Sequence, residues 1–190
     1  MKNKKFWITL GVIALVVIIL ISSVAGSYNG LVNRQTAVES QFAQVQNVLQ
    51  RRSDLIPNLV NTVKGYAAHE NELYTAIAEA RAALAGADTV EETSAANTAL
   101  DSALSRLLVI VENYPDLKAN QNFISLQDEL AGTENRIAQE RKLYNEAVQD
   151  YNSSIRKFPK NIIAGIFGFE KADFFEADAQ AQDVPEVSFD

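Results

Sequence analysis

Apolar side chains recur in alternating steps of four and three residues through much of the chain, and this pattern constrains the fold more than any other feature. The stripe positions are Leu31, Gln35, Val38, Phe42, Val45, Leu49, Arg52, Ile56, Leu59, Val63, Tyr66, Glu70, Leu73, Ile77, Ala80 and Leu84. A repeat of this kind places one apolar face along a helix and is typical of bundles and coiled coils. No run of alternating residues indicates a strand, so we expect an all-α protein.

Two further apolar stripes follow, over residues 100–111 and 123–158, the second with one four-residue stutter. Turn residues separate the stripes. Residues 86–89 predict a turn in which Asp88 or Thr89 caps the next helix. Residues 113–116 end that helix at a proline, Asn120 is a suitable cap for the last helix, and Pro159 ends it.

The first stripe contains two interruptions, Pro57 and Gly65. We expect a kink at Pro57 and a break at Gly65. The break predicts four helices, at about residues 28–64, 69–86, 89–112 and 120–158. Because the first and last are the longest, we expect an antiparallel up-and-down four-helix bundle that pairs them. The alternative is three helices with one long, kinked first helix.

The N-terminus predicts a membrane anchor. Three lysines precede sixteen residues, 6–21, that are apolar except for Thr9 and Gly11, and no charged side chain lies between Lys5 and Arg34. Residues 6–26 approach the ~20 needed to cross a bilayer as a helix. The alternative is a cleaved signal peptide, for which residues 23–25 would serve as the small-residue site.

The distribution of basic residues predicts the orientation of this anchor. Lys2, Lys4 and Lys5 flank one end, and Arg34 is the only basic residue soon after the other. The positive-inside rule then places the N-terminus in the cytoplasm and the main domain outside. We expect a single-pass protein of the bacterial cell membrane, in contact with lipid through residues 6–26.

Most of the net charge of −7 lies at the C-terminal end of the chain. Residues 170–190 carry seven acids and one lysine, a balance of about −6, so the rest is nearly neutral. No basic surface for nucleic acid is expected. The predicted organisation is an N-terminus and membrane helix (1–27), a bundle (28–159), an apolar membrane-proximal segment (160–175) and an acidic, disordered tail (176–190).

The dipeptide Tyr-Asn occurs three times. Tyr144-Asn145 and Tyr151-Asn152 are seven residues apart, and Tyr28-Asn29 lies far upstream. Antiparallel pairing of the long helices would bring Tyr28-Asn29 within a turn of Tyr151-Asn152. We expect buried rings with amides that bond across helices and fix their register. The alternative is that the asparagines face water beside ordinary core tyrosines.

Arginines and a glutamate also lie along the same two helices, and two of the arginines, Arg52 and Arg141, occupy stripe positions. The pairing brings Arg51 and Arg52 opposite Glu134, with Arg141 within two turns. We expect a polar layer of these four residues across the bundle. Such a layer specifies helix pairing, and it could also bind a ligand or a partner.

Residues suited to catalysis are scarce. His69 is the only histidine, and in His69-Glu70-Asn71-Glu72-Leu73 the second histidine of a zinc-protease motif is replaced by Leu73. The chain has no cysteine. We therefore expect no metal, no cofactor and no enzymatic activity; a hydrolase that uses His69 is the least favoured alternative.

Residues 161–169 are apolar and uncharged. They leave the bundle at the end where the anchor enters, and they are too few to span a membrane. They predict either a short helix that closes the base of the bundle, or a segment that lies on the bilayer or contacts a neighbouring copy.

Taken together, these segments resemble the LemA family. The resemblance covers about residues 7 to 175 and rests on a combination of motifs rather than on any one. The motifs are Tyr28-Asn29, Arg51-Arg52-x-Asp54-Leu55-Ile56-Pro57-Asn58-Leu59-Val60, Lys64-Gly65-Tyr66, Ala80-Arg81, Glu112-x-Tyr114-Pro115, Arg141-x-x-Tyr144-Asn145, Tyr151-Asn152 and Phe158-Pro159. The resemblance implies a single-pass bacterial membrane protein with a helical bundle. It implies little about activity.

The function that we expect is that of a scaffold or adaptor which acts by protein contacts and forms homo-oligomers. A membrane-protein partner is also expected, without an identity. One alternative is an extracytoplasmic sensor of a small ligand or peptide. Another is a regulator of a membrane protease, which only the resemblance to the family suggests.

Overall fold

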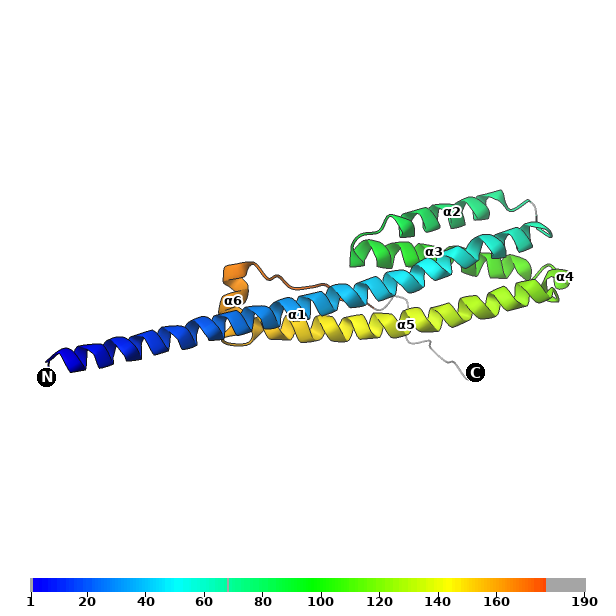
Figure 1. Cartoon of the computed structure of the whole chain (residues 1–190). Helices are drawn as coiled ribbons and strands as arrows, with labels where there is room; N and C mark the ends of the chain where they lie inside the picture. Colours follow the sequence, from blue (N-terminus) through cyan, green and yellow to red (C-terminus); the bar gives the residue numbers. More distant parts are fainter. Residues whose placement is uncertain (1, 68, 177–190) are drawn as a thin grey trace, which may run out of the picture. The chain divides into compact units, whose positions relative to one another are not determined.

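The computed structural model describes residues 2–67 and 69–176, and this part of the chain consists mainly of helices (Figure 1). The helices are α1 (Lys2–Lys64), α2 (Asn71–Ala85), α3 (Val90–Val111), α4 (Pro115–Lys118), α5 (Gln121–Arg156) and α6 (Lys160–Phe167). No strand occurs among the described residues. The predicted all-α class is therefore confirmed.

The chain forms two compact units, and α1 and α5 contribute to both. The first unit contains the described residues up to Ser40 and residues 146–172. The second unit contains residues 41–145 and the described residues from Asp173 onward. Each unit is described by itself below.

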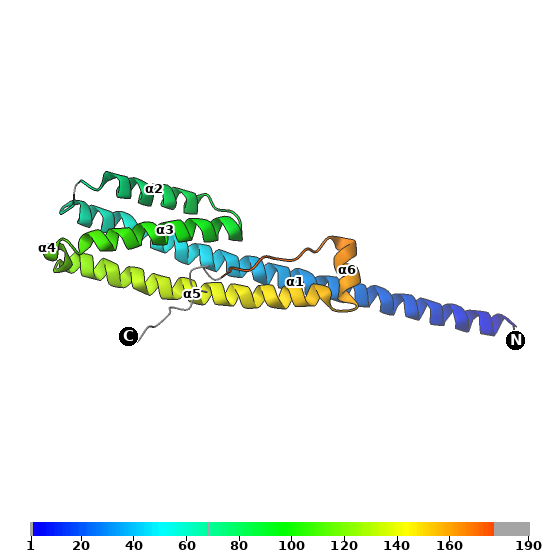
Figure 2. The ribbon, with the colours of Figure 1, turned by 180° about the vertical axis from the view of Figure 1, so that it is seen from behind.

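The second unit is a helical bundle. It combines the last part of α1, the first part of α5, and the antiparallel pair α2 and α3, which lie side by side in Figures 1 and 2. The core is built from the apolar stripes of the sequence. Its central members are Ile56, Leu59, Val63, Leu73, Ile77, Leu100, Leu104, Leu107, Val111, Leu117 and Phe123. Apolar burial of this kind is the main source of stability in a bundle.

The helix boundaries of the second unit follow local capping chemistry. Thr89 caps α3, since its hydroxyl accepts a hydrogen bond from the Glu92 amide while the Glu92 carboxylate accepts one from the Thr89 amide. The Asn120 side chain accepts bonds from the amides of Asn122 and Phe123 at the start of α5. Pro115 occupies the first turn of α4, where its missing N–H leaves no hydrogen bond unmade.

The first helix continues through Pro57 and ends at Lys64. The following helix begins at Asn71, so the break predicted at Gly65 is present, with the next helix two residues later than expected. Upstream, α1 continues without interruption into the apolar N-terminal stretch. The bundle helix predicted at residues 28–64 is therefore the second half of a longer helix.

The first unit contains the start of α1, the end of α5, and α6. Its buried side chains come from all three helices: Leu31, Val38, Val148, Tyr151, Ile155, Ile163 and Ala164. The turn that ends α6 requires Gly168, whose φ of 73° is left-handed. This conformation lets the amide of Phe169 bond to the carbonyl of Ala164 and close the helix.

The two long helices are antiparallel within each unit, as predicted. In the first unit Arg34 lies 3.8 Å from Asp150. In the second unit the ring of Phe42 lies against that of Tyr144, with centroids 5.8 Å apart. Both contacts have the register expected when the start of α1 meets the end of α5.

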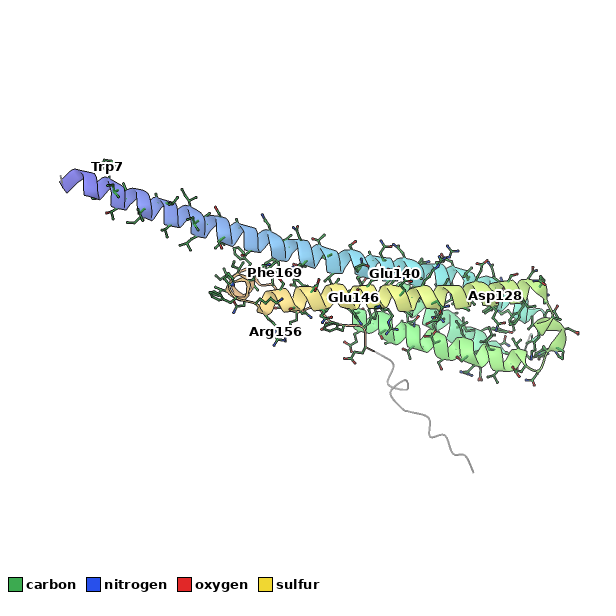
Figure 3. All side chains as sticks on the ribbon, turned by 90° about the horizontal axis from the view of Figure 1, so that it is seen from below. Trp7, Asp128, Glu140, Glu146, Arg156 and Phe169 are labelled. Carbon is green, nitrogen blue, oxygen red and sulfur yellow. The ribbon has the colours of Figure 1, made fainter. Side chains whose placement is uncertain are left out.

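The N-terminal part of α1 is long and apolar enough to cross a membrane, as judged by length and composition. Its side chains from Phe6 onward are exposed in the structure, and Trp7 projects freely from the helix in Figure 3. The predicted acidic tail begins at Glu176, and residues 177–190 lie outside the described part of the chain.

Candidate functional site

The buried polar layer of the second unit is centred on Arg52. This arginine occupies a core position of α1 and is only 6% exposed. Its guanidinium donates to the side-chain oxygen of Asn97 at 3.1 Å and forms an ion pair with Glu134 at 2.8 Å. It also forms a hydrogen-bonded ion pair with Asp101. One side chain of α1 therefore binds both α3 and α5.

The layer extends to the remaining bundle helix. Arg81 of α2 donates from Nε to the carbonyl oxygen of Ser53 at 3.0 Å and to its hydroxyl at 3.2 Å. On α3, the Asn97 amide donates to the Asp101 carboxylate at 2.9 Å, since the two residues are one turn apart. The network thus joins all four bundle helices at one level.

The charged groups of the layer hold helices together by pairing with one buried guanidinium. A guanidinium that is removed from water must be paired and hydrogen-bonded, or its burial is costly. Arg52 meets this requirement with two carboxylates and one amide. Its Nε is buried and has no hydrogen-bond partner. The Asp101 and Glu134 side chains are partly exposed, so water can solvate their remaining oxygens.

The structure places only two of the four predicted layer residues together. Arg52 and Glu134 are paired, whereas Arg51 is exposed on α1. Neighbouring positions on a helix differ by about 100° in direction. Arg141 contacts the C-terminal end of the described chain instead, because it lies two turns beyond Glu134 on α5.

Two members of the layer, Asn97 and Asp101, were absent from the prediction. Asn97 lies one step before Leu100 on the apolar stripe of α3. Extending that stripe backward by three residues would have found it. Asp101 lies four residues after Asn97, and at this spacing an asparagine amide can bond to a carboxylate on the same helix.

The second candidate site involves residues 169–176, which follow α6 without regular secondary structure and are called the strap below. In the second unit, Asn145 binds the backbone of Phe175 twice. Its amide nitrogen donates to the Phe175 carbonyl at 2.9 Å, and its oxygen accepts from the Phe175 amide at 2.9 Å. The Tyr144 hydroxyl donates to the Asp173 carbonyl at 2.9 Å.

An aromatic cluster surrounds the Phe175 side chain in the same unit. The ring centroid of Tyr144 lies 5.1 Å from that of Phe175, and the ring of Phe42 stacks at 6.2 Å. The guanidinium of Arg141 lies 5.0 Å above the Phe175 ring and donates to the Glu176 carbonyl at 2.7 Å. Phe175 is 5% exposed as a result.

The first unit repeats the backbone contacts with the other copy of the dipeptide. Asn152 donates to the Ala172 carbonyl at 2.8 Å and accepts from the Ala172 amide at 2.9 Å. The Tyr151 hydroxyl donates to the Glu170 carbonyl at 2.8 Å. A primary amide carries both a donor and an acceptor, so it can pair with a backbone as a neighbouring strand would. The recognition depends on the backbone of the strap.

The predicted register pairs therefore have different partners from those expected. Tyr151 and Asn152 bind the strap rather than the upstream dipeptide. Tyr28 packs against the rings of Phe167 and Phe169, with centroids 4.8 and 5.7 Å away. Asn29 is exposed on α1. Sequence patterns reveal helix partners, but they give no signal for a non-helical segment that bonds through its backbone.

Both clamping tyrosines have perturbed acidity. Burial raises the pKa of Tyr144 to about 12, and the nearby Asp173 carboxylate adds to this shift. Burial also raises the pKa of Tyr151, followed by the charges of Glu170 and Glu39. Both phenols remain neutral donors over the whole physiological range, which suits hydrogen bonds to carbonyl oxygens.

His69 is the residue that the sequence offers for catalysis. His69 is exposed in the turn between α1 and α2. No cluster of three or more metal-ligating side chains occurs among the described residues. The arrangements described above bind helices and backbone.

Comparison with known proteins places this architecture in a family. The model of the LemA family matches residues 41–189. Magnetosome protein MamQ 2 of Paramagnetospirillum magneticum is 26% identical, with 90% of this chain and 72% of that protein covered. MamQ of Magnetospirillum gryphiswaldense is 24% identical, with 94% and 75% covered. Protein LemA of Metamycoplasma hominis is 28% identical, with 87% and 74% covered. The chain therefore belongs to the LemA family.

Proposed function

We propose that this protein is a membrane-anchored, non-enzymatic scaffold or adaptor that acts by protein contacts at the bacterial cell membrane and assembles with copies of itself. The N-terminus lies in the cytoplasm and the bundle lies outside. The anchor is the apolar start of α1, which is long enough to span a bilayer. Relatives that are named magnetosome proteins and LemA support a role at a membrane.

The Arg52 network, in which the guanidinium binds three side chains of its own bundle, is the observation that carries this proposal. A site for chemistry or for a ligand needs polar groups that are free to engage it. The guanidinium of Arg52 instead binds Asn97, Asp101 and Glu134 of its own bundle. The main buried charge is therefore used to hold helices together, which leaves the outer surface for partners.

Self-assembly has a surface available on α3. Leu108 and Val109 are exposed there, although Leu104, Leu107 and Val111 of the same helix are buried. Val109→Glu should weaken association because it places a charge in an apolar contact. Ser105→Glu adds the same charge at an exposed position on the same helix and serves as the matched control.

Crosslinking in native membranes, followed by mass spectrometry of the neighbours, tests the contact role. We expect copies of the chain and at least one membrane protein among the products. Light scattering of the detergent-solubilised protein should give a mass above that of the monomer, reduced by Val109→Glu and not by Ser105→Glu. A monodisperse monomer with no specific neighbours would contradict the proposal.

The sensor alternative depends on the exposed side of the polar layer, where Glu134 is accessible to solvent. A thermal-shift screen separates the two functions. A ligand that raises Tm for the native chain and not for Arg52→Ala would favour the sensor. For the scaffold we expect no such ligand. A reporter fused after Asp190 tests the orientation, since activity on the cytoplasmic side would reverse it.

A further inference from the structure

From Ile162 to Phe167 the helix α6 is apolar, but it is buried on only one side. Ile163 and Ala164 are buried against the first unit. On the opposite side, Ile166 is 72% exposed and Ile162 is also exposed. Phe158, in the turn before the helix, is 80% exposed. A helix with this composition is normally covered on every side, so the outer side of α6 lacks its expected environment.

The position of α6 identifies the environment that is missing. The ring of Phe167 at its end and the ring of Phe169 just beyond it both contact Tyr28 of α1. Tyr28 follows the predicted membrane segment of α1, residues 6–26, by two residues. The helix is therefore attached to α1 at the level where the predicted membrane segment ends, and Figure 3 shows Phe169 beside α1 there.

A cationic depression lies next to α6 in the same unit. It is an open hollow lined in part by Ser27, Arg34, Asp150, Lys157 and Lys160. Three cations therefore face one carboxylate. The Lys160 ammonium lies beside the backbone of α1 at Gly30 and within 3.5 Å of the Ser154 hydroxyl. Hydroxyls and ammonium groups around an open hollow can bind phosphate oxygens.

From these three features we propose that α6 and the depression form a docking surface for a bilayer that contains anionic phospholipid. Ile162, Ile166 and Phe158 enter the boundary between headgroups and acyl chains, as an interfacial helix does. Lys157 and Lys160 bind the phosphates of the lipid headgroups. The surface is continuous with the anchor, and it fixes the first unit against the membrane.

This inference rests on the proposed membrane anchorage, and a nitroxide experiment tests the two separately. The chain has no cysteine, so single cysteines can be introduced without other changes. Ile166→Cys reports on the docking surface, Ile13→Cys on the anchor, and Lys171→Cys on an exposed position of the first unit. The full-length protein is placed in nanodiscs of phosphatidylcholine, with or without phosphatidylglycerol. Accessibility to oxygen and to a water-soluble nickel chelate is then measured.

We expect the label at position 166 to prefer oxygen, as position 13 does, while position 171 prefers the nickel chelate. Phosphatidylglycerol should increase the preference at 166. The double variant Lys157→Gln/Lys160→Gln should remove that increase and leave position 13 unchanged. Circular dichroism of each variant checks that the helices are retained.

Three outcomes would overturn the inference. If position 166 is as accessible to the nickel chelate as position 171 in both lipids, while position 13 is in hydrocarbon, α6 does not dock and the anchor stands. If position 13 is also in water, the proposed anchorage itself fails. If position 166 is shielded from both reagents, the occupant is a protein surface, such as a second copy, rather than lipid.

Discussion

The two Tyr-Asn pairs of α5 make the same backbone contacts with the strap, but they differ in the burial of the strap residue that the asparagine binds. Asn145 and Asn152 each form two hydrogen bonds with one residue. At Asn145 that residue is Phe175, whose ring is buried among aromatic groups. At Asn152 it is Ala172, which is only half-buried. We call these the anchored clamp and the open clamp.

The comparison separates register from stability. Seven residues of a helix advance about 10.5 Å, and three extended residues advance about 10 Å. Ala172 and Phe175 are three residues apart, as are Glu170 and Asp173. The seven-residue spacing of the dipeptides on the helix therefore matches the three-residue spacing of their binding partners in the strap. The hydrogen bonds determine which strap residue is bound, and the buried ring should determine how tightly.

The largest expected effect is at Phe175, the buried residue of the anchored clamp. Phe175→Ala removes a buried ring and should cost about 3 kcal/mol of strap docking. Phe174→Ala is the matched control, because Phe174 is 44% exposed and its loss should cost less than about 0.5 kcal/mol. Hydrogen exchange of the strap amides measures both. Equal protection in the two variants would mean that the ring does not anchor the strap.

The next effect compares the two asparagines directly. Asn145→Ala leaves the amide and carbonyl of Phe175 without partners beside a buried ring and should cost about 2 kcal/mol. Asn152→Ala should cost about 1 kcal/mol, because water can reach the half-buried Ala172. The amide of Phe175 should then exchange about thirtyfold faster in Asn145→Ala, and that of Ala172 about fivefold faster in Asn152→Ala. Equal losses would remove the distinction between the clamps.

Much of this molecule could be predicted from sequence because its signals are local or periodic. Thr89 and Asn120 cap helices through bonds to residues two or three positions away. Arg52 is predicted to be buried because it occupies a position of an apolar stripe. Antiparallel pairing of the two long helices then predicts Glu134 as its partner. Each step uses only helix geometry, which a single sequence contains.

The strap could not be placed in the same way. Its bonds use carbonyl and amide groups that every residue possesses, so residues 170–173 carry no distinguishing pattern. The repeated dipeptide was visible, but an asparagine side chain looks the same whether its partner is another helix or a backbone. Phe175 offered the one apolar signal, and the acidic residues around it resemble a disordered tail.

A third test uses the acidity of the two clamping phenols. The pKa of Tyr144 is raised to about 12, above its ordinary value of 10.0, so folding favours the neutral phenol. The resulting stabilisation is complete below about pH 10 and is lost as the pH rises toward 12. Tyr144→Phe should cost about 1 kcal/mol at pH 8 through the lost bond to Asp173.

The same variant should flatten the alkaline loss of stability, measured as the urea midpoint between pH 8 and 11.5. Tyr151→Phe should flatten it less, because the pKa of Tyr151 is raised without the aromatic enclosure of Tyr144. Absorbance at 295 nm follows ionisation of the phenols in each variant. If Tyr151→Phe has the larger effect, the open clamp is the better protected one and the comparison is reversed.

The smallest expected effect concerns Arg141, the cation over the anchored ring. Arg141→Met keeps a long apolar side chain but removes the charge over Phe175 and the bond to the Glu176 carbonyl. We expect a loss of about 0.5–1 kcal/mol in strap docking, as for exposed cation–π pairs. Arg136→Met, at an exposed position of the same helix, is the matched control and should change docking by less than about 0.5 kcal/mol.

Arg141→Lys retains the charge but loses the planar group that covers the ring, so an intermediate loss would identify stacking as part of the interaction. Because Arg141 contacts Phe175 and Glu176 of the anchored clamp, amide exchange at Ala172 should respond to none of these three changes. A response there would mean that the strap docks as one unit rather than clamp by clamp.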